Sequence, residues 1–314
     1  MANCNILFSK YHSQISLTSS KTERMKKSKN GLRQRIRAYF KENHPDYHPK
    51  FYIQGSYKMK TSIRTKDDIC DLDDGVYFFR SPDVSATTLQ TWIKNAVDGY
   101  TSENPEHRSK CIRNIFANDY EIDIPVYYKI DDKEYQLAIK NTGWQDSDSK
   151  AIVNWFNEQK DNDGVLVRIV KYLKGWCDEK RNKMPNGLAM TILASNAMKK
   201  ISYNSERDDI TLKDILKEIQ KELDKEFACE VPVTPFDNLF ENYDEKRKNN
   251  FLSCLSIFVS DAEEAVKETN QLKASKLWRK HLGDRFPEGE NKNEDMKQFA
   301  GIITGANGSN PWAK

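Results

Sequence analysis

The stretch Cys70-Asp71-Leu72-Asp73-Asp74-Gly75-Val76-Tyr77-Phe78-Phe79 decides how the chain is interpreted. Its apolar and aromatic residues predict a β-strand in which acidic residues are embedded. Residues two apart in a strand project from the same face, so Asp71 and Asp73 share one face, away from Leu72. Such like charges repel, and a divalent cation is the ordinary way to neutralise them. The stretch therefore predicts a metal site, with two solvated acids on an exposed strand face as the alternative.

A third acid lies downstream, in Glu121-Ile122-Asp123-Ile124-Pro125-Val126. This run is also typical of a strand, and Asp123 interrupts what would otherwise be core, where an unpaired carboxylate is costly. We predict that Asp123 joins the same metal site, so that two ions can bind. The alternative is an edge strand with Asp123 facing solvent, which Pro125 favours because proline avoids central strands.

A glycine-containing turn, Gln54-Gly55-Ser56, follows the short predicted strand Phe51-Tyr52-Ile53. Glycine lets the backbone approach a phosphate closely, and its amide with the Ser56 hydroxyl can bind a triphosphate. Alone, such a pair is more often a simple turn. Because the acidic strand and the third acid follow it in order, we predict a nucleotide-binding turn.

Three of these segments together resemble the nucleotidyltransferase signature of the polymerase-β superfamily, and specifically the bacterial cGAS/DncV-like nucleotidyltransferases (CD-NTases). Residues 143–150 and 185–191 resemble the entry of that family into its helical lobe. The resemblance implies an enzyme that joins two or three nucleoside triphosphates into a cyclic oligonucleotide second messenger, for anti-phage (CBASS-type) signalling. The matching motifs are Gln54-Gly55-Ser56-Tyr57-x-x-x-Thr61, Cys70-Asp71-Leu72-Asp73-Asp74-Gly75-Val76-Tyr77 and Ile122-Asp123-Ile124-Pro125-Val126.

The resemblance also implies roles for individual residues. Two Mg²⁺ ions, or Mn²⁺, would be held by Asp71, Asp73 and Asp123. A helical lysine of the family reaches the donor triphosphate, and Lys171 matches it better than Lys174. Many relatives have a small hydroxyl residue where this chain has asparagine at 186. The predicted nucleotide-binding residues are Gln54, Gly55, Ser56, Lys171 and Asn186.

The implied substrates are nucleoside triphosphates, with ATP and GTP favoured. We expect a purine-containing cyclic dinucleotide, such as cyclic di-GMP or cyclic GMP-AMP, rather than a trinucleotide. A downstream effector would sense this product rather than bind the enzyme, which we expect to be a monomer. The animal DNA sensor of the superfamily has a zinc thumb of His and Cys, and this sequence has no such cluster, so no DNA activator is expected.

The composition is that of a globular protein without a strong overall field. Of 314 residues, 38% are hydrophobic, and 50 basic against 47 acidic side chains leave a formal charge of +3. That balance does not attract the whole molecule to nucleic acid or to a membrane. Six scattered cysteines without a CxxC pair favour a reducing compartment. No apolar run is long enough for a membrane span, so we expect a soluble, cytoplasmic protein that is not exported.

The periodicity predicts two lobes in an α+β (mixed) fold. The first, residues 1–148, is a polymerase-β-like nucleotidyltransferase core with a mixed sheet, preceded by one long helix over residues 13–43 with a break near 29–31. It includes a helix over 85–100 and a hairpin of 120–130 with 135–139, which completes the sheet. The second, residues 149–286, is all helical, and residues 287–314 form a flexible or loosely docked tail. Its predicted helices are 152–159, 165–181, 187–200, 212–227, 246–260 and 261–282.

Two other functions remain open at this point. A different polymerase-β-type transferase could add nucleotides to RNA or to a small hydroxyl compound, with the basic run of residues 21–37 as an RNA surface. A charge run on a helix is more often a solvated face. The chain could also be a non-catalytic nucleotide-binding module, although degenerate members commonly lose an acid and all three are present here.

Overall fold

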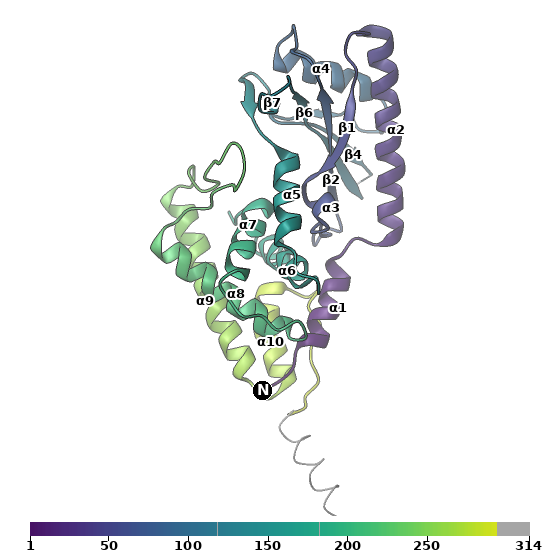
Figure 1. Ribbon diagram of the computed structural model, residues 1–314. Helices are drawn as coiled ribbons and strands as arrows, with labels where there is room; N and C mark the ends of the chain where they lie inside the picture. The colour runs from purple at the N-terminus through teal and green to yellow at the C-terminus, as the bar shows by residue number, and fades with distance from the viewer. Residues whose placement is uncertain (118, 182, 294–314) are drawn as a thin grey trace, which may run out of the picture.

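The computed structural model describes residues 1–117, 119–181 and 183–293, and in it a sheet lobe stands beside a helical lobe (Figure 1). The predicted mixed α+β fold with two lobes is confirmed. The strands are β1 (Lys50–Gln54), β2 (Cys70–Phe78), β3 (Glu106–His107), β4 (Ile112–Phe116), β5 (Tyr120–Ile124), β6 (Val126–Tyr128), β7 (Gln136–Ile139) and β8 (Gly143–Asp146). The helices are α1 (Asn5–Ile15), α2 (Ser19–Asn43), α3 (Gly55–Met59), α4 (Ala86–Val97), α5 (Ser149–Gln159), α6 (Val165–Lys180), α7 (Gly187–Met198), α8 (Asp208–Lys225), α9 (Glu245–Lys267) and α10 (Gln271–Leu282).

Strand β2 lies inside one mixed sheet, whose order is β3-β4-β5-β2-β6-β7-β8 with β1 also paired to β2. It runs parallel to β5 and β6 and antiparallel to β1. Strands β5 and β6 continue one another across Pro125, whose carbonyl accepts from the Val76 amide at 2.9 Å. Since β5 also pairs with β4, Asp123 does not lie on an edge strand, and that alternative is wrong. The prediction missed β3, β4 and β8, which are short and carry polar residues.

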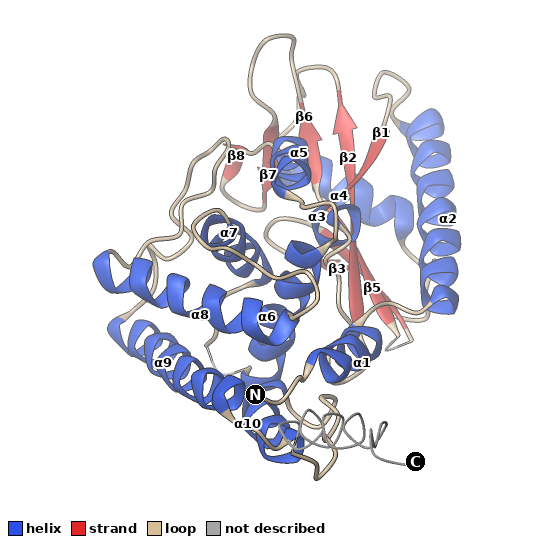
Figure 2. Ribbon diagram, turned by 60° about the horizontal axis from the view of Figure 1, so that its bottom comes forward, coloured by secondary structure: helices blue, strands red, loops and turns tan. Residues whose placement is uncertain are grey.

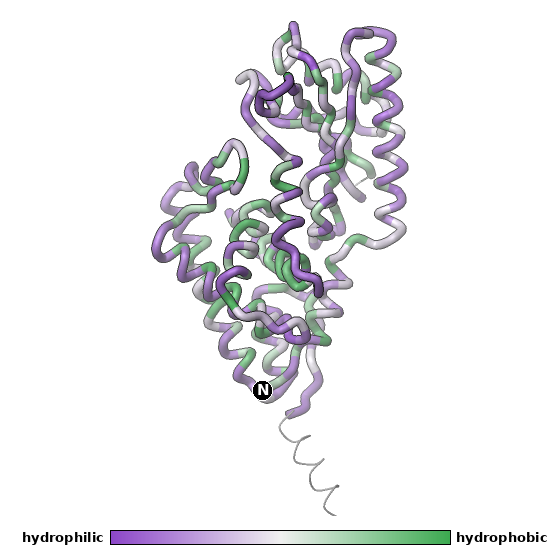
Figure 3. The backbone as a smooth tube through the Cα atoms, viewed as in Figure 1, coloured by the Kyte–Doolittle hydropathy of each residue, from purple (hydrophilic) through white to green (hydrophobic). Residues whose placement is uncertain are grey.

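One face of the sheet is covered by α2 and α4, and these elements share a buried core (Figure 2). The buried side chains of α2, which include Lys21 and Lys29, recur every third or fourth position, as a helix with one covered face requires, and hydrophilic positions alternate with them along the tube in Figure 3. Burying each apolar side chain among them contributes about 1.5 to 3 kcal/mol. The core-facing residues of α2 are Met25, Leu32, Ile36 and Phe40.

The first two helices belong to different lobes. Phe8 and Tyr11 of α1 are buried in the core of the helical lobe, where the Phe8 ring lies 5.1 Å from that of Tyr172. The chain then turns at Thr18, whose hydroxyl caps α2 by accepting from the Lys21 amide at 3.1 Å. The predicted long helix is confirmed as α2, but it begins at Ser19 rather than at residue 13, and the break expected near 29–31 is wrong, since α2 continues through Gly31.

Helices α7 to α10 and α1 form the second lobe around α6, and α5 connects the two lobes (Figures 1 and 2). Residues 287–293 lie against α10, where the Leu272 amide donates to the Glu290 carbonyl at 3.0 Å and the Gly289 amide to Ser275 Oγ at 2.8 Å. The start of the predicted loose tail is thus well packed, and residues 294–314 lie outside the described residues. All six cysteines are free thiols. None of the helices in the described ranges is both long and apolar enough to cross a membrane.

Candidate active site

A cavity of about 530 Å³ opens where the two lobes meet. Its wall combines α3 and the loop after it, the acidic end of β2, the first turn of α5, and parts of α6 and α7. It therefore brings together segments that are separated by more than a hundred positions in the sequence. The residues that matter chemically in the wall are Gln54, Gly55, Ser56, Asp71, Asp73, Lys174 and Asn186.

Asp71 and Asp73 occupy the same face of β2, as the alternation predicted, while Cys70, Leu72 and Asp74 are buried on the other face. Burial, followed by the charges of Asp71 and Asp123, raises the pKa of Asp73 to about 8. Burial also raises the pKa of Asp71, which the ammonium of Lys174 opposes. Ionising both of these carboxylates at once is therefore unfavourable.

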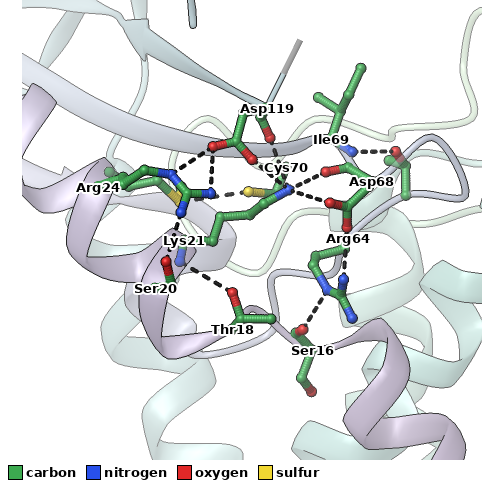
Figure 4. A network of polar contacts seen from close by, with 12 residues as sticks. Ser16, Thr18, Ser20, Lys21, Arg24, Arg64, Asp68, Ile69, Cys70 and Asp119 are labelled. Carbon is green, nitrogen blue, oxygen red and sulfur yellow. Dashed lines mark hydrogen bonds and ion pairs between the residues drawn. The ribbon is translucent and has the colours of Figure 1, made fainter. Parts of the chain in front are cut away.

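A buried lysine fixes the starts of the two acidic strands (Figure 4). The side chain of Lys21 on α2 is only 3% exposed, and its ammonium binds Asp68 just before β2 and Asp119 just before β5. Its Nζ lies 3.1 Å from Asp68 Oδ2 and 2.9 Å from Asp119 Oδ1, and it also donates to both backbone carbonyls. Because both strands start from this one cation, the register that places Asp73 beside Asp123 is held at its origin.

The predicted nucleotide turn contacts the acids directly. Gly55 has a φ of +61°, and a Cβ at this position would lie 2.0 Å from Asp73 Oδ2, so only glycine fits. The Ser56 hydroxyl shares a hydrogen bond of 2.7 Å with Ser62. The Gln54 side chain turns away into the core, where its oxygen accepts from the Tyr77 hydroxyl at 2.8 Å. Gln54 therefore contributes its backbone, not its amide group, to the wall.

The lysine in the cavity is Lys174 and not Lys171. Lys174 Nζ donates to Thr61 Oγ1 at 3.1 Å, and burial lowers its pKa to about 8 although Asp71 and Asp73 oppose this. Lys171 instead donates to Ser16 Oγ at 2.9 Å, beside α1 and away from the acids. The prediction that Lys171 binds the nucleotide therefore does not agree with the position of this residue outside the cavity. The two lysines are three apart on one helix face, so the sequence carries no signal that separates them.

Asn186 lies in the wall, but its side chain has a structural partner. It precedes α7, and its Oδ1 accepts from the Ala189 amide at 2.9 Å as an N-cap. The next residue, Gly187, packs against Lys174, because a Cβ there would lie 3.1 Å from Lys174 Cε. The cap thus sets the start of α7 beside the lysine.

Asp123 lies beside the cavity and not in its wall. Its Cα pairs with that of Asp73 in the parallel register, and its side chain is 13% exposed. Arg113 on β4 binds it with both arms: Nε donates to Oδ1 and Nη2 to Oδ2, each at 2.8 Å. Within the described ranges, no three His, Cys, Asp or Glu side chains are arranged to hold a cation. The sequence analysis missed Arg113 because it missed β4.

The donor set nevertheless fits a divalent cation. Carboxylate oxygens are the ligands that Mg²⁺ and Mn²⁺ prefer, and β2 and β5 bring three carboxylates into adjoining positions. Burial first, and then the charges of Asp71 and Asp123, raise the pKa of Asp73, so a positive charge at these carboxylates would be stabilising. Asp71 and Asp73 face the cavity, whereas Asp123 is already paired with Arg113.

A second cavity of about 180 Å³ adjoins the first and shares Ser149, Ile152 and Leu188 with it. Its far wall is the segment before α9, where the Thr234 carbonyl accepts from the Asp148 amide at 3.3 Å. The two cavities thus form one continuous hollow along the start of α5.

Comparison with known proteins agrees with this geometry. Residues 49–127 match the family model for the nucleotidyltransferase domain of cyclic GMP-AMP synthase DncV-like proteins. A cyclic GMP-AMP synthase of Escherichia albertii is 32% identical over 187 residues, which cover 54% of this chain and 40% of that protein. A cyclic AMP-AMP-AMP synthase of an Acinetobacter species is 24% identical over 257 residues, which cover 76% of this chain and 73% of that protein.

Among solved structures, the Vibrio cholerae DncV cyclic AMP-GMP synthase superposes with a TM-score of 0.80 at 18% identity, covering 91% of this chain and 98% of that one. The sequence match spans about half, or less, of the first three curated relatives. The fold is nevertheless shared over nearly the full length of the DncV structure, and the matched region contains β1, α3, β2 and the strands that carry Asp123. The predicted resemblance is confirmed: residues 49–127 match the DncV-like nucleotidyltransferase model, and the chain shares the DncV fold.

Proposed function

We propose that this chain synthesises a cyclic oligonucleotide from nucleoside triphosphates by nucleotidyl transfer with release of pyrophosphate. The observation that carries the proposal is the single cavity that joins the Gly55-Ser56 turn, Asp71 with Asp73, and Lys174. These groups are what the reaction needs: a backbone turn and a cation for phosphates, and carboxylates for a metal. The relatives named for cyclic nucleotide synthesis support the same reaction class.

In the proposed reaction, the residues of the site have separate roles. The Gly55-Ser56 backbone and hydroxyl bind the donor triphosphate, and Lys174 binds it as a point charge from the opposite wall. A divalent cation held by Asp71, Asp73 and Asp123, two ions in our proposal, would neutralise phosphate charge and lower the pKa of the acceptor hydroxyl. Asp123 stands next to Asp73 on the neighbouring strand and would lie nearest that hydroxyl. Most of the rate enhancement would come from positioning and charge neutralisation.

The second cavity is proposed to take the acceptor nucleotide. Relatives named for GMP-AMP and AMP-AMP-AMP synthesis make ATP and GTP the favoured substrates, and we favour a purine dinucleotide product. In this proposal the protein is a cytoplasmic monomer whose product signals infection to a separate effector. No DNA activator takes part.

The test is incubation of the purified chain with all four labelled triphosphates and Mg²⁺, without RNA, followed by alkaline phosphatase and mass spectrometry. We expect a phosphatase-resistant cyclic product, absent with an Asp71→Asn/Asp73→Asn variant. Products that remain phosphatase-sensitive, or labelling that requires added RNA, would favour the other transferase chemistry. Triphosphate binding with no product under any condition would leave a binding module.

A further inference from the structure

Arg113 stands between two carboxylates of one strand. Besides its two-armed contact with Asp123, its Nη1 forms an ion pair with Glu121 Oε2. Glu121 and Asp123 are two apart on β5 and so share one face, and β4 places Arg113 directly opposite Asp123. The arginine side chain is 22% exposed, so this partly desolvated pair is stronger than a surface one.

This contact occupies the oxygens that a cation would need. Each oxygen of Asp123 accepts one guanidinium hydrogen bond, whereas within the described ranges no lysine or arginine is hydrogen-bonded to Asp71 or Asp73. The three acids are thus in unequal states: two face the cavity, and the third is already neutralised by the protein. Because the Arg113 charge lies against both oxygens, a cation that binds Asp123 competes with Arg113 for this carboxylate.

We propose that Arg113 is an internal counter-cation that holds Asp123 while the site is empty and passes to Glu121 when a divalent cation takes the carboxylate. The inference rests on the proposed role of Asp123 as a metal ligand. It makes Arg113 a positioning residue that sets how tightly the site binds metal, and it makes Glu121 the acceptor that keeps the released guanidinium paired.

Glu121 is suited to that part because its contact with Arg113 already exists. When the guanidinium rotates toward Glu121, its ion pair with Asp123 breaks while its ion pair with Glu121 is kept. Arg113 is therefore never left as an unpaired charge. Without Arg113 the acids would repel one another more strongly, and without Glu121 the arginine would have one partner only. The two substitutions therefore change metal affinity in opposite directions.

The experiment is calorimetric titration of the full chain with Mn²⁺ in the absence of nucleotide. Arg113→Gln should bind Mn²⁺ about tenfold more tightly than wild type, the order expected from losing one charge-assisted pair that competes with the metal. Glu121→Gln should bind severalfold more weakly. The matched control is Arg80→Gln, which removes the same charge from the loop after β2, where Arg80 pairs with Asp83 at 3.7 Å. It should stay within about twofold of wild type, since it does not compete for Asp123.

Thermal unfolding is the second readout. Metal-free Arg113→Gln should unfold at a lower temperature than metal-free wild type. Saturating Mn²⁺ should raise the Tm of this variant by more than it raises the Tm of wild type. If Arg113→Gln does not fold, Arg113→Lys can replace it, because lysine keeps the charge but loses the two-armed contact. The Mn²⁺ affinity of Arg113→Lys should then exceed that of wild type by a smaller factor.

The outcomes separate this inference from the proposed function. Unchanged affinity in Arg113→Gln, together with weaker binding in Asp123→Asn, would overturn the role of Arg113 and leave Asp123 a ligand. Wild-type affinity in Asp123→Asn with loss of binding in Asp71→Asn/Asp73→Asn would overturn the inference by removing Asp123 from the site. Wild-type binding in all of these variants would overturn the metal site itself.

Discussion

Strand β2 carries acids on both faces, and the protein treats the two faces differently. On the covered face, Asp74 is 3% exposed and bound by Arg33 of α2, whose Nε donates to Oδ2 at 2.7 Å. On the cavity face, Asp71 and Asp73 have no such partner among the described residues, and the pKa of Asp73 rises to about 8. The fold supplies its own cation where an acid stabilises the packing of α2. It supplies no such partner from the described residues where, in our proposal, a cation from outside binds.

The largest effect should come from the cavity face. Asp71→Asn/Asp73→Asn should reduce product formation at least about a thousandfold, because the phosphate-neutralising metal loses two ligands. Its thermal stability should equal or exceed that of the metal-free wild type, since the substitution removes like-charge repulsion. Mass spectrometry measures product formation, and thermal unfolding measures stability. Activity within tenfold of wild type would contradict the assignment.

The covered face should give the reverse pattern. Asp74→Asn leaves the Arg33 guanidinium without its partner against the sheet, so the free energy of unfolding should fall by about 3 kcal/mol. The folded fraction should keep product formation within severalfold of wild type. Chemical denaturation and activity per folded molecule would both be measured. If Asp74→Asn were as stable as wild type but inactive, the proposed difference between the two faces would be wrong.

The dependence of stability on pH should distinguish the cavity acids next. The folded-state pKa of Asp73 is raised from 3.8 to about 8, so the native protein keeps a proton that the unfolded chain loses. The stability of metal-free protein should therefore fall by several kcal/mol, relative to that of Asp73→Asn, as pH rises from 4 to 8. Saturating Mg²⁺ should remove most of this slope. Denaturation at several pH values measures it, and a metal-free wild type that gains stability against Asp73→Asn over this range would contradict the sign.

The smallest effect concerns the start of the acidic strands. Lys21→Met should cost about 1 to 2 kcal/mol, because Asp68 and Asp119 lose their shared cation but are exposed enough to be hydrated. Since β2 and β5 would then be less firmly held in register, product formation should also fall severalfold. A matched control is Lys26→Met, an exposed lysine of the same helix that pairs with Glu23, which should change neither quantity measurably. Equal results for both variants would show that the buried cation does not position the strands.

Much of the fold follows from local patterns. The alternation in residues 70–78 and the apolar stripes of α4 to α8 were sufficient to place those elements. The boundary between α9 and α10 was wrong because Asp261 resembles a helix cap. In the structure its carboxylate contacts the ring of His281 at 2.8 Å, and α9 continues to Lys267. A contact between two helices thus overrode a local signal.

The site was predictable only where a motif carried it. Gly55, Asp71 and Asp73 could be placed because glycine's conformational freedom and the two-residue period act locally. The pairing of Arg113 with Asp123 depends on the register of β4 against β5, a long-range property that no short pattern encodes. The position of Lys174 depends on how α6 turns toward the sheet lobe, which neighbouring lysines do not reveal.

The most direct test of the central claim is a crystal soaked in Mn²⁺, with the metal located by its anomalous scattering. We predict a peak at about 2.1 Å from carboxylate oxygens of both Asp71 and Asp73, with Arg113 turned from Asp123 toward Glu121. A soaked crystal with no peak at these carboxylates, in which Arg113 still binds Asp123 with both arms, would contradict it.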